Sequence, residues 1–167
     1  ELLNIVKKVQ VSDRLNLNTV EFFAKNWQEN YMKNLLIACE DIQFEQIKNK
    51  SSHPVVVASG GPSLTKQLED LKKYMDKVII IASGSTINSL LKAGIDPDFV
   101  VTVDGAEANY NHFKDIKEIN STLIYCLSSH YKIQYNYPGR RIPFIAKKDD
   151  YQINKLLNKA KLELPAF

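Results

Sequence analysis

The sequence has only two cysteines, Cys39 and Cys126, and they do not stand at the spacing of a metal site. With six glycines and six prolines among 167 residues, it is neither collagen-like nor of low complexity. Its hydrophobic runs, such as 55–58 and 78–82, are far shorter than the roughly 20 residues that cross a membrane. The first residues also lack the basic start and apolar stretch of a signal peptide. We therefore expect no membrane span, buried free thiols and a cytoplasmic location.

Charges of the two signs are nearly balanced, with 22 Lys and Arg against 19 Asp and Glu, for a net charge of +3. The excess positive charge lies near the end, where residues 119–167 carry eight basic and three acidic residues. Tyrosines interleave these basic residues, which include Lys132, Arg140 and Arg141. That pattern suits nucleic acid. Because no RNA- or DNA-binding motif accompanies it, we expect a solvated face or a wall for an anionic substrate, and no nucleic-acid partner.

The first third of the sequence predicts a helical extension over residues 1–53. Apolar residues recur every three to four positions between 15 and 47, with aromatic side chains among them. That spacing predicts one long helix whose aromatic stripe packs on the rest of the protein. A polar linker with a proline, 48–54, follows it.

From residue 54 onward, short apolar and β-branched runs alternate with helical patterns. Five such runs are predicted strands, at 55–58, 78–82, 99–103, 123–127 and 142–146. Gly94 is predicted to stop the helix after the second strand. Buried strands that alternate with helices are typical of a parallel sheet covered by helices on both faces. We expect a Rossmann-like α/β core over residues 54–167.

The sequence starts at Glu1 rather than Met and stops at Phe167 inside an apolar stretch. After a helical extension, few residues remain for a complete core of this kind. We expect a truncated domain, incomplete at its C-terminal side, whose own activity is in question. Such a piece would expose a sheet edge or helix face that pairs with another copy, giving a homo-oligomer.

Two segments repeat one pattern of strand, Ser-Gly turn and helix start, at 55–60 and 79–84. In a parallel sheet both turns lie at the carboxyl ends of the strands, where open α/β sheets bind ligands. In the first turn, Gly60 and Gly61 permit close approach and a positive φ, and Pro62 suits the first helical position. The amides of Ser63 and Leu64 and the Ser63 hydroxyl would then face an anion, most naturally a phosphate.

Asp104 ends the third predicted strand at the same edge and has three readings. It is a ligand for a metal that bridges nucleotide phosphates, a partner of a ribose hydroxyl, or the start of an Asp-Gly turn. Asp96 and Asp98 flank a proline in a turn and are expected to be structural, although Asp98 is close enough in sequence to contribute. His112 and His130 follow strands three and four, where each is a candidate general base or an ordinary surface histidine.

Three segments together resemble a known family. They are Ala58-Ser59-Gly60-Gly61-Pro62-Ser63-Leu64, the loop at 80–86 and the stretch 90–104, which contains Ala-Gly-Ile-Asp-Pro-Asp and ends in Asp104. They are similar to the 6-hydroxymethylpterin diphosphokinase MptE-like family, which includes the bacterial motility accessory factors. The helical segment with Asn26, Asn30 and Asn34 resembles the asparagine-bearing segment of that bacterial branch.

The resemblance implies a nucleotide-dependent transferase. Motility accessory factors are regarded as glycosyltransferases that move a nonulosonic acid from a CMP donor to serine or threonine of flagellin. The archaeal branch transfers diphosphate from ATP to a pterin with magnesium. Residues that match the family's nucleotide turn, its second loop and its strand-end acid are Ser59, Gly60, Gly61, Pro62, Ser63, Leu64, Ser83, Gly84, Ser85 and Asp104.

Three functions therefore stay open at this point. The first is a glycosyltransferase that uses a CMP-activated sugar, and the second is an ATP- and magnesium-dependent diphosphokinase. The third is a nucleotide-binding or partner-docking module without turnover. Asp104, His130 and His112 are the candidate catalytic residues, and Asp104 is the candidate metal ligand.

Overall fold

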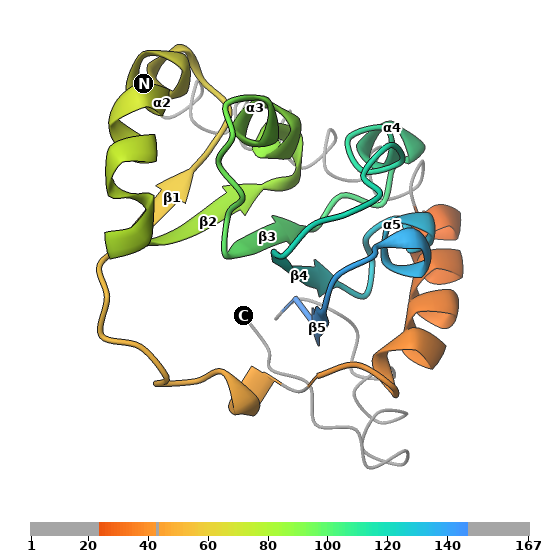
Figure 1. Ribbon diagram of the computed structural model, residues 1–167. Coiled ribbons are helices and arrows are strands. Elements are labelled where there is room, and N and C mark those ends of the chain that lie inside the picture. The colour runs from red at the N-terminus through yellow and green to blue at the C-terminus, as the bar shows by residue number, and fades with distance from the viewer. Residues whose placement is uncertain (1–23, 43, 147–167) are drawn as a thin grey trace, which may run out of the picture.

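The computed structural model describes residues 24–42 and 44–146 of the chain. Its centre is a five-stranded parallel sheet with the strand order β1-β2-β3-β4-β5 (Figure 1). The strands are β1 (Val55–Ala58), β2 (Ile79–Ser83), β3 (Phe99–Thr102), β4 (Thr122–Cys126) and β5 (Arg141–Phe144). The five predicted strands are thus confirmed to within two residues, because short β-branched runs buried in a parallel sheet leave a clear signal. The Rossmann-like α/β class is confirmed with them.

The helices that connect neighbouring strands cover one face of this sheet (Figure 1). They are α2 (Pro62–Tyr74), α3 (Ile87–Lys92), α4 (Glu107–Tyr110) and α5 (Tyr131–Asn136), with the short 3₁₀ helices η2 (Met75–Lys77) and η3 (Gly84–Thr86). A further 3₁₀ helix, η1 (Phe44–Gln46), precedes β1 and lies beside β5. Right-handed crossovers between strands in sequential order bring every connection to the same side. Of the two helical layers that the sequence predicts, the described residues contain this one.

The core lies between the sheet and this helical layer. Ala58, Ala82, Val100 and Leu123 occupy one row across β1 to β4, as the strand register shows. All four are nearly or fully buried. The two alanines leave room for the adjacent helices to approach the sheet closely, since protein interiors are packed without large voids. This core holds the carboxyl ends of the strands at a common edge.

Two helix boundaries follow the predicted chemistry. Pro62 begins α2, where its missing N–H costs no hydrogen bond. Gly94 follows α3 with φ of 75°, and its N–H donates to the Leu91 carbonyl at 2.9 Å. The Ile95 N–H donates to the Leu90 carbonyl at 2.9 Å. Gly94 therefore stops the helix as predicted, because a left-handed residue closes such a turn and glycine adopts that conformation without strain.

The predicted long helix ends earlier than expected. Within the described residues it covers 24–38, and the part predicted at 15–23 lies outside them. Its end differs from the predicted residue 47 because Asp41 turns back to the sheet. Arg141 Nη2 and Tyr125 Oη contact the two oxygens of Asp41 at 2.7 and 2.8 Å. The Ile42 N–H also donates to the Arg141 carbonyl at 3.2 Å, which fixes the chain beside β5.

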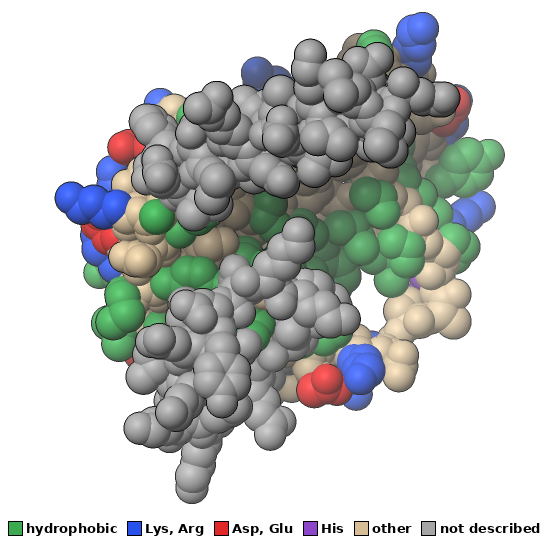
Figure 2. Space-filling model, turned by 180° about the vertical axis from the view of Figure 1, so that it is seen from behind, with side chains coloured by type: hydrophobic (Ala, Val, Ile, Leu, Met, Phe, Trp, Pro, Cys, Tyr) green, Lys and Arg blue, Asp and Glu red, His purple; other side chains and the backbone are tan. Residues whose placement is uncertain are grey.

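The opposite face and the β1 edge of the sheet carry exposed apolar side chains. Val55 and Val57 of β1 are 55% and 72% exposed. Figure 2 shows hydrophobic side chains on the surface of the molecule seen from behind.

In the described part of the chain, no helix is both long and apolar enough to cross a membrane. Both cysteines are free, as predicted, but Cys39 is exposed rather than buried.

Candidate functional site

The carboxyl ends of the first four strands form one continuous edge, because hydrogen bonds join neighbouring loops. Thr86 Oγ1 donates to the Ala58 carbonyl at 3.3 Å and so joins the loop after β2 to the end of β1. Asn109 Nδ2 and the His130 N–H both donate to the Asp104 carbonyl, at 2.8 and 3.1 Å. The residues predicted to form a site after strands one to four therefore do lie along one edge of the sheet.

The turn 59–64 leads from β1 into α2 and is exposed. Neither Gly60 nor Gly61 has the positive φ that the sequence suggested, and Gly61 is extended with φ of 179°. The Leu64 N–H donates to the Gly61 carbonyl at 3.1 Å, so this amide is already used, contrary to the prediction. The Ser63 N–H, at the second position of the helix, has no intrahelical acceptor. It lies where the dipole of this 13-residue helix attracts an anion.

The glycines of this turn keep space open above it. A Cβ atom at Gly61 would come no closer than 3.9 Å to another group, Ser63 Oγ. One at Gly60 would meet Ser85 Oγ at 3.7 Å and Thr86 Cγ2 at 3.8 Å, which are ordinary contacts. The packing of the described residues therefore does not require glycine at either position. Their small size instead leaves the backbone accessible to a ligand.

A cavity of about 500 Å³ opens beside this turn, between β1 and α2. The hydroxyl-bearing Ser59 and Ser63 line it next to the turn, and Gln67, Asp70 and apolar side chains of both elements line the rest. Its volume is in the range of small-ligand sites in proteins. The predicted phosphate turn is thus next to a concave surface large enough for more than a phosphate.

The second predicted turn places its hydroxyl groups next to the first. Ser83 Oγ lies 3.1 Å from Ser85 Oγ and 3.2 Å from Thr86 Oγ1. Gly60 lies close to this cluster, since a Cβ atom there would be in van der Waals contact with Ser85 and Thr86. Gly84 is buried, and a Cβ there would meet the Phe113 ring at 2.9 Å. Gly84 thus has a packing role, whereas the exposed Ser85 hydroxyl is available to a ligand.

Asp104 is exposed at the end of β3, and its carboxylate begins a tight turn. Its Oδ1 accepts a hydrogen bond from the Ala106 N–H at 2.9 Å, the geometry of an Asx turn. In the part of the chain that the structure describes, no three His, Cys, Asp or Glu side chains gather as a metal site. The interpretation of Asp104 as the start of a turn is therefore supported by a direct hydrogen bond. Its carboxylate is also exposed to solvent, at the same edge of the sheet as the two turns.

The two candidate histidines lie in different surroundings. His112 follows α4, and its carbonyl accepts a hydrogen bond from Asn88 Nδ2 at 2.9 Å. His130 is 8% exposed and stacks with Tyr110 and Tyr131, at centroid distances of 5.8 and 5.3 Å. Burial lowers the pKa of His130, so its neutral form is favoured. The structure thus places His130, but not His112, in an enclosed polar site.

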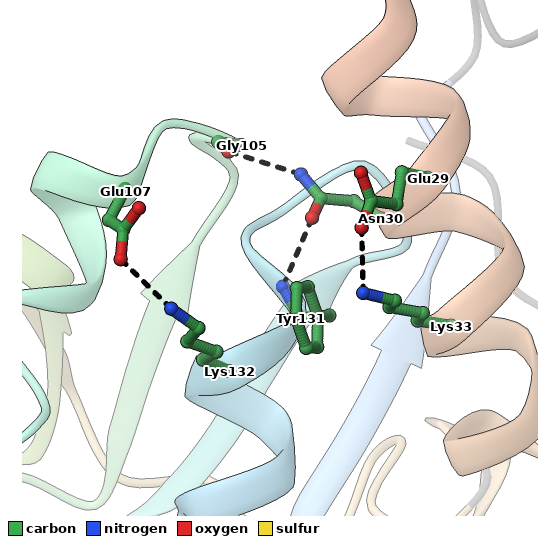
Figure 3. A network of polar contacts seen from close by, with 7 residues as sticks. All are labelled: Glu29, Asn30, Lys33, Gly105, Glu107, Tyr131 and Lys132. Carbon is green, nitrogen blue, oxygen red and sulfur yellow. Dashed lines mark hydrogen bonds and ion pairs between the residues drawn. The ribbon is translucent and has the colours of Figure 1, made fainter.

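That site is a second cavity, of about 210 Å³, between the 24–38 helix and the loops after β3 and β4. Two ion pairs flank it, Glu107 with Lys132 at 2.9 Å and Glu29 with Lys33 at 2.7 Å (Figure 3). In each pair the lysine lowers the pKa of the carboxyl group, and the carboxylate raises the pKa of the lysine. The residues that line this cavity are Asn26, Glu29, Asn30, Gly105, Glu107, His130, Tyr131 and Lys132.

Two asparagines attach the 24–38 helix to this edge. Asn30 Nδ2 donates to the carbonyls of Gly105 and Ser128 at 3.1 and 3.2 Å, and its Oδ1 accepts the Tyr131 N–H at 3.3 Å (Figure 3). One turn later, Asn34 Nδ2 donates to the carbonyls at 127 and 129, at 2.8 and 2.7 Å. Both asparagines are buried. The resemblance had pointed to this segment, but not to its contacts.

Sequence reasoning named His130 and Lys132 but missed the groups that they meet in the second cavity. Glu107 of α4 and Lys132 of α5 come from two different helices and meet only in the folded chain. Glu29 and Lys33 stand four residues apart on a helix, a spacing typical of an exposed ion pair, and nothing in it indicates a cavity wall. No local signal in the sequence would have brought these groups together.

Several other candidates lie away from this edge. The Asp98 carboxylate accepts the Ile80 N–H at 2.8 Å, and Asp96 binds Asn120 and Ser121. Both aspartates are at the amino ends of the strands, so Asp98 does not contribute to the site. Arg140 lines a cavity at that amino edge.

Among the described residues, the basic side chains near the end of the chain do not gather into the anion-binding wall that their charge suggested. Arg141 is held in the ion pair with Asp41, at 2.7 Å. Lys147 and Lys148 lie outside the described residues. Of the residues predicted for that wall, Lys132 does line the second cavity, where Glu107 neutralises it.

Comparison with known proteins gives a family and a remote structural likeness. The family described as 6-hydroxymethylpterin diphosphokinase MptE-like matches residues 29–165. No curated protein matches the sequence significantly. A structure of a MAf glycosyltransferase from Magnetospirillum magneticum AMB-1 is similar, with 23% sequence identity and a TM-score of 0.49. The similarity covers 57% of this chain and only 16% of that protein, so this chain corresponds to a small part of its length.

Proposed function

The chain belongs to the 6-hydroxymethylpterin diphosphokinase MptE-like family, and from this premise we propose that it is the nucleotide-binding core of a transferase. The observation that carries the proposal is the arrangement of the first two turns. The Ser63 amide at the start of α2, the open space over Gly61 and the hydroxyl of Ser85 all lie at the same edge. A nucleotide phosphate is the ligand that a helix N-terminus with adjacent hydroxyl groups favours.

The reaction we propose is transfer of a CMP-activated nonulosonic acid to a serine or threonine hydroxyl of flagellin. The helical segment with Asn26, Asn30 and Asn34, which resembles the asparagine-bearing segment of the motility accessory factors, supports this choice. Hydrogen bonds from the Ser63 amide and hydroxyl would stabilise the negative charge that develops on the departing CMP phosphate. The 500 Å³ cavity next to the turn offers room for the rest of the nucleotide. The free thiols fit a reducing compartment, and we propose the cytoplasm.

An ATP- and magnesium-dependent diphosphokinase is the second candidate, because Asp104 is exposed at the same edge. Mg²⁺ commonly binds through one or two carboxylates together with substrate phosphates and water. A single exposed carboxylate, with no gathered set of three acidic, histidine or cysteine ligands in the described ranges, fits that mode of binding. Asp104 would then hold the ion, which would neutralise the charge of the phosphates.

A thermal-shift panel separates these functions. The chain is heated with CMP, CDP, ATP or GTP, each with and without Mg²⁺, and the melting temperature is compared with that of the free protein. Stabilisation by CMP without Mg²⁺ supports the glycosyltransferase, and stabilisation by ATP only with Mg²⁺ supports the diphosphokinase. Asp104→Asn should remove the second response and leave the first.

A substitution in the turn tests where the nucleotide binds. Gly61→Val places a branched side chain in the open space over the turn and should abolish the nucleotide response. Ser89→Ala, on the exposed surface of α3, is the matched control and should keep the response. Absence of a response to any nucleotide would contradict both enzyme proposals. An unchanged response in Gly61→Val would place the nucleotide elsewhere. If a nucleotide stabilises the chain but no transfer reaction is detected, the third function, a nucleotide-binding module, is the one supported.

A further inference from the structure

We propose that the 210 Å³ cavity between the 24–38 helix and the loops after β3 and β4 binds an uncharged, hydroxyl-bearing ligand, with the His130 Nε2–H as a hydrogen-bond donor. This ligand would be the acceptor of the group transfer. In that one point the inference rests on the proposed function. The cavity holds the volume of about seven waters at the density of liquid water. It therefore suits a group the size of one sugar ring or of one residue of a peptide.

The charges of the cavity favour an uncharged ligand. Glu107 is paired with Lys132, and Glu29 is paired with Lys33, at hydrogen-bonding distances. A charged ligand would have to break one of these pairs or be placed beside a like charge without a partner. A ligand with hydroxyl groups can instead donate to the carboxylates and accept from the lysine, since both have further hydrogen-bonding capacity.

The aromatic side chains of the cavity argue against a nucleobase. The His130 ring stacks on Tyr110 and on Tyr131 with interplanar angles of 18° and 17°. Lys33 Nζ lies 3.7 Å from the centre of the Tyr131 ring. These contacts occupy ring faces on which a flat base would stack. Recognition in this cavity therefore depends on hydrogen bonds, and the nucleotide proposed above belongs at the first turn.

The two ring nitrogens of His130 differ in a way that fixes the role of this residue. Nδ1 is completely buried and has no hydrogen-bond partner in the described part of the chain. Nε2 is not enclosed in this way, and His130 lines the cavity, so Nε2 is the nitrogen that a ligand can reach. A buried N–H without an acceptor is rarer and more costly than a buried lone pair without a donor. The neutral ring therefore carries its proton on Nε2.

This tautomer changes the role that the sequence suggested for His130. With the proton on Nε2, the atom that faces the cavity donates a hydrogen bond and cannot accept a proton from a ligand hydroxyl. His130 is therefore expected to bind and orient a ligand oxygen rather than to act as a general base.

The walls of the cavity are held in place before a ligand arrives. A Cβ at Gly105 would lie 2.6 Å from the Ser128 carbonyl oxygen and 2.8 Å from Trp27 Cδ1, so the loop after β3 is tightly packed on its neighbours. Asn30 connects this loop to the loop after β4 through three hydrogen bonds. A site built in this way loses little conformational entropy on binding.

Nuclear magnetic resonance of the chain labelled with ¹⁵N tests the inference directly. The histidine ring nitrogens report which atom is protonated, and we expect the Nε2–H form for His130 at neutral pH. Two neutral probes are then titrated separately, methyl β-glucopyranoside for a sugar source and N-acetyl-threonine N-methylamide for a peptide source. A probe of the right chemistry should shift the signals of His130, Tyr131 and Gly105. The probe with the larger effect identifies the source of the hydroxyl group.

Two variants of His130 complete the test. His130→Phe keeps an aromatic ring for stacking but removes the donor, and should weaken binding of the probe roughly tenfold. His130→Gln retains an N–H donor and should recover part of that loss. Melting curves and amide spectra establish that each variant is folded. An Nδ1–H tautomer, equal binding to wild type and His130→Phe, or no shift with either probe would overturn the inference.

The outcome is independent of the nucleotide site. CMP titrated into the same sample should shift signals of the turn 59–64 and not those of His130. If CMP shifts neither site while a neutral probe binds, the proposed function fails but the cavity assignment stands. If CMP shifts His130 in place of the turn, the cavity is a nucleotide site and this inference fails.

Discussion

The side-chain amide of Asn30 donates a hydrogen bond of 3.1 Å to the carbonyl of Gly105, 75 residues further along the chain. The same amide reaches the Ser128 carbonyl and the Tyr131 N–H. A single buried side chain thus connects the 24–38 helix with the loops after two adjacent strands. The helix is therefore a wall of the second cavity as well as an extension of the core.

Asn30→Asp should destabilise the fold by about 2 kcal/mol, because two backbone carbonyls would then face a carboxylate oxygen instead of an N–H donor. Urea unfolding measures the loss. Asn26→Asp, at an exposed position one turn earlier on the same helix, is the matched control and should change stability little. Equal stability of the two variants would show that the hydrogen bonds of Asn30 contribute little to the fold.

Asp41→Asn should destabilise the chain by about 3 kcal/mol, because Arg141 would lose its ionised partner. The Asp41 side chain is only 4% exposed, so solvent cannot replace this contact effectively. Asp70→Asn is the control, since the exposed pair of Asp70 with Lys73 is expected to contribute almost nothing. Thermal unfolding at low and high salt distinguishes the two, and similar losses for both variants would contradict the prediction.

The strands could be predicted from sequence because the signal is local. Runs such as Val55–Ala58 and Ile79–Ser83 are continuous and apolar, as a strand of a parallel sheet requires. Gly94 and Pro62 marked helix ends for equally local reasons. The end of the 24–38 helix was not predictable in this way. It depends on Asp41 meeting Arg141, which lies 100 residues away.

The candidate site was likewise predictable only where its residues are adjacent in the sequence. The first turn could be found from sequence, because the glycines, the proline and Ser63 that form it are adjacent in the chain. Its details could not, since the Leu64 amide is used by the Gly61 carbonyl and neither glycine has a positive φ. The cavity at His130 depends on contacts between loops and a helix that are 75 or more residues apart, such as those of Asn30 with Gly105, Ser128 and Tyr131.

The stability of the protein should fall as the pH drops below about 6.5, and His130 should be one cause. Burial lowers the pKa of His130 below its ordinary value of 6.5. Below that value the unfolded chain takes up a proton that the folded chain does not, so the stabilisation is present above pH 6.5 and is lost as the pH falls through the lower, folded pKa. Glu29, Glu107, Lys33 and Lys132 also face this ring and modify its pKa.

His130→Gln tests this dependence, because glutamine does not titrate. Chemical unfolding of the wild type and the variant between pH 5 and pH 8 gives the slope of stability with pH. The variant should have a shallower slope on the acidic side and a similar one near pH 8. Parallel curves over the whole range would show that His130 binds its proton equally in the folded and unfolded chains.

Gly61→Ala and Gly105→Ala should have opposite effects on stability and on nucleotide binding. At Gly105 the new Cβ would lie 2.6 Å from the backbone oxygen of Ser128, so the loop must move, at a cost of about 2 kcal/mol. At Gly61 the space is open and the backbone is extended, so alanine should be tolerated or slightly stabilising. The methyl group would instead occupy space over the turn where the phosphate is proposed to bind.

Melting temperatures with and without CMP or ATP separate the two effects. For Gly61→Ala we expect a melting temperature close to that of the wild type and a reduced shift on adding nucleotide. For Gly105→Ala we expect a lower melting temperature and a nucleotide shift similar to that of the wild type, because its loop is not part of the first turn. A full nucleotide response in Gly61→Ala would mean that the ligand does not approach the turn closely. Gly61 would then have no role in ligand binding and would serve only the extended backbone that leads into α2.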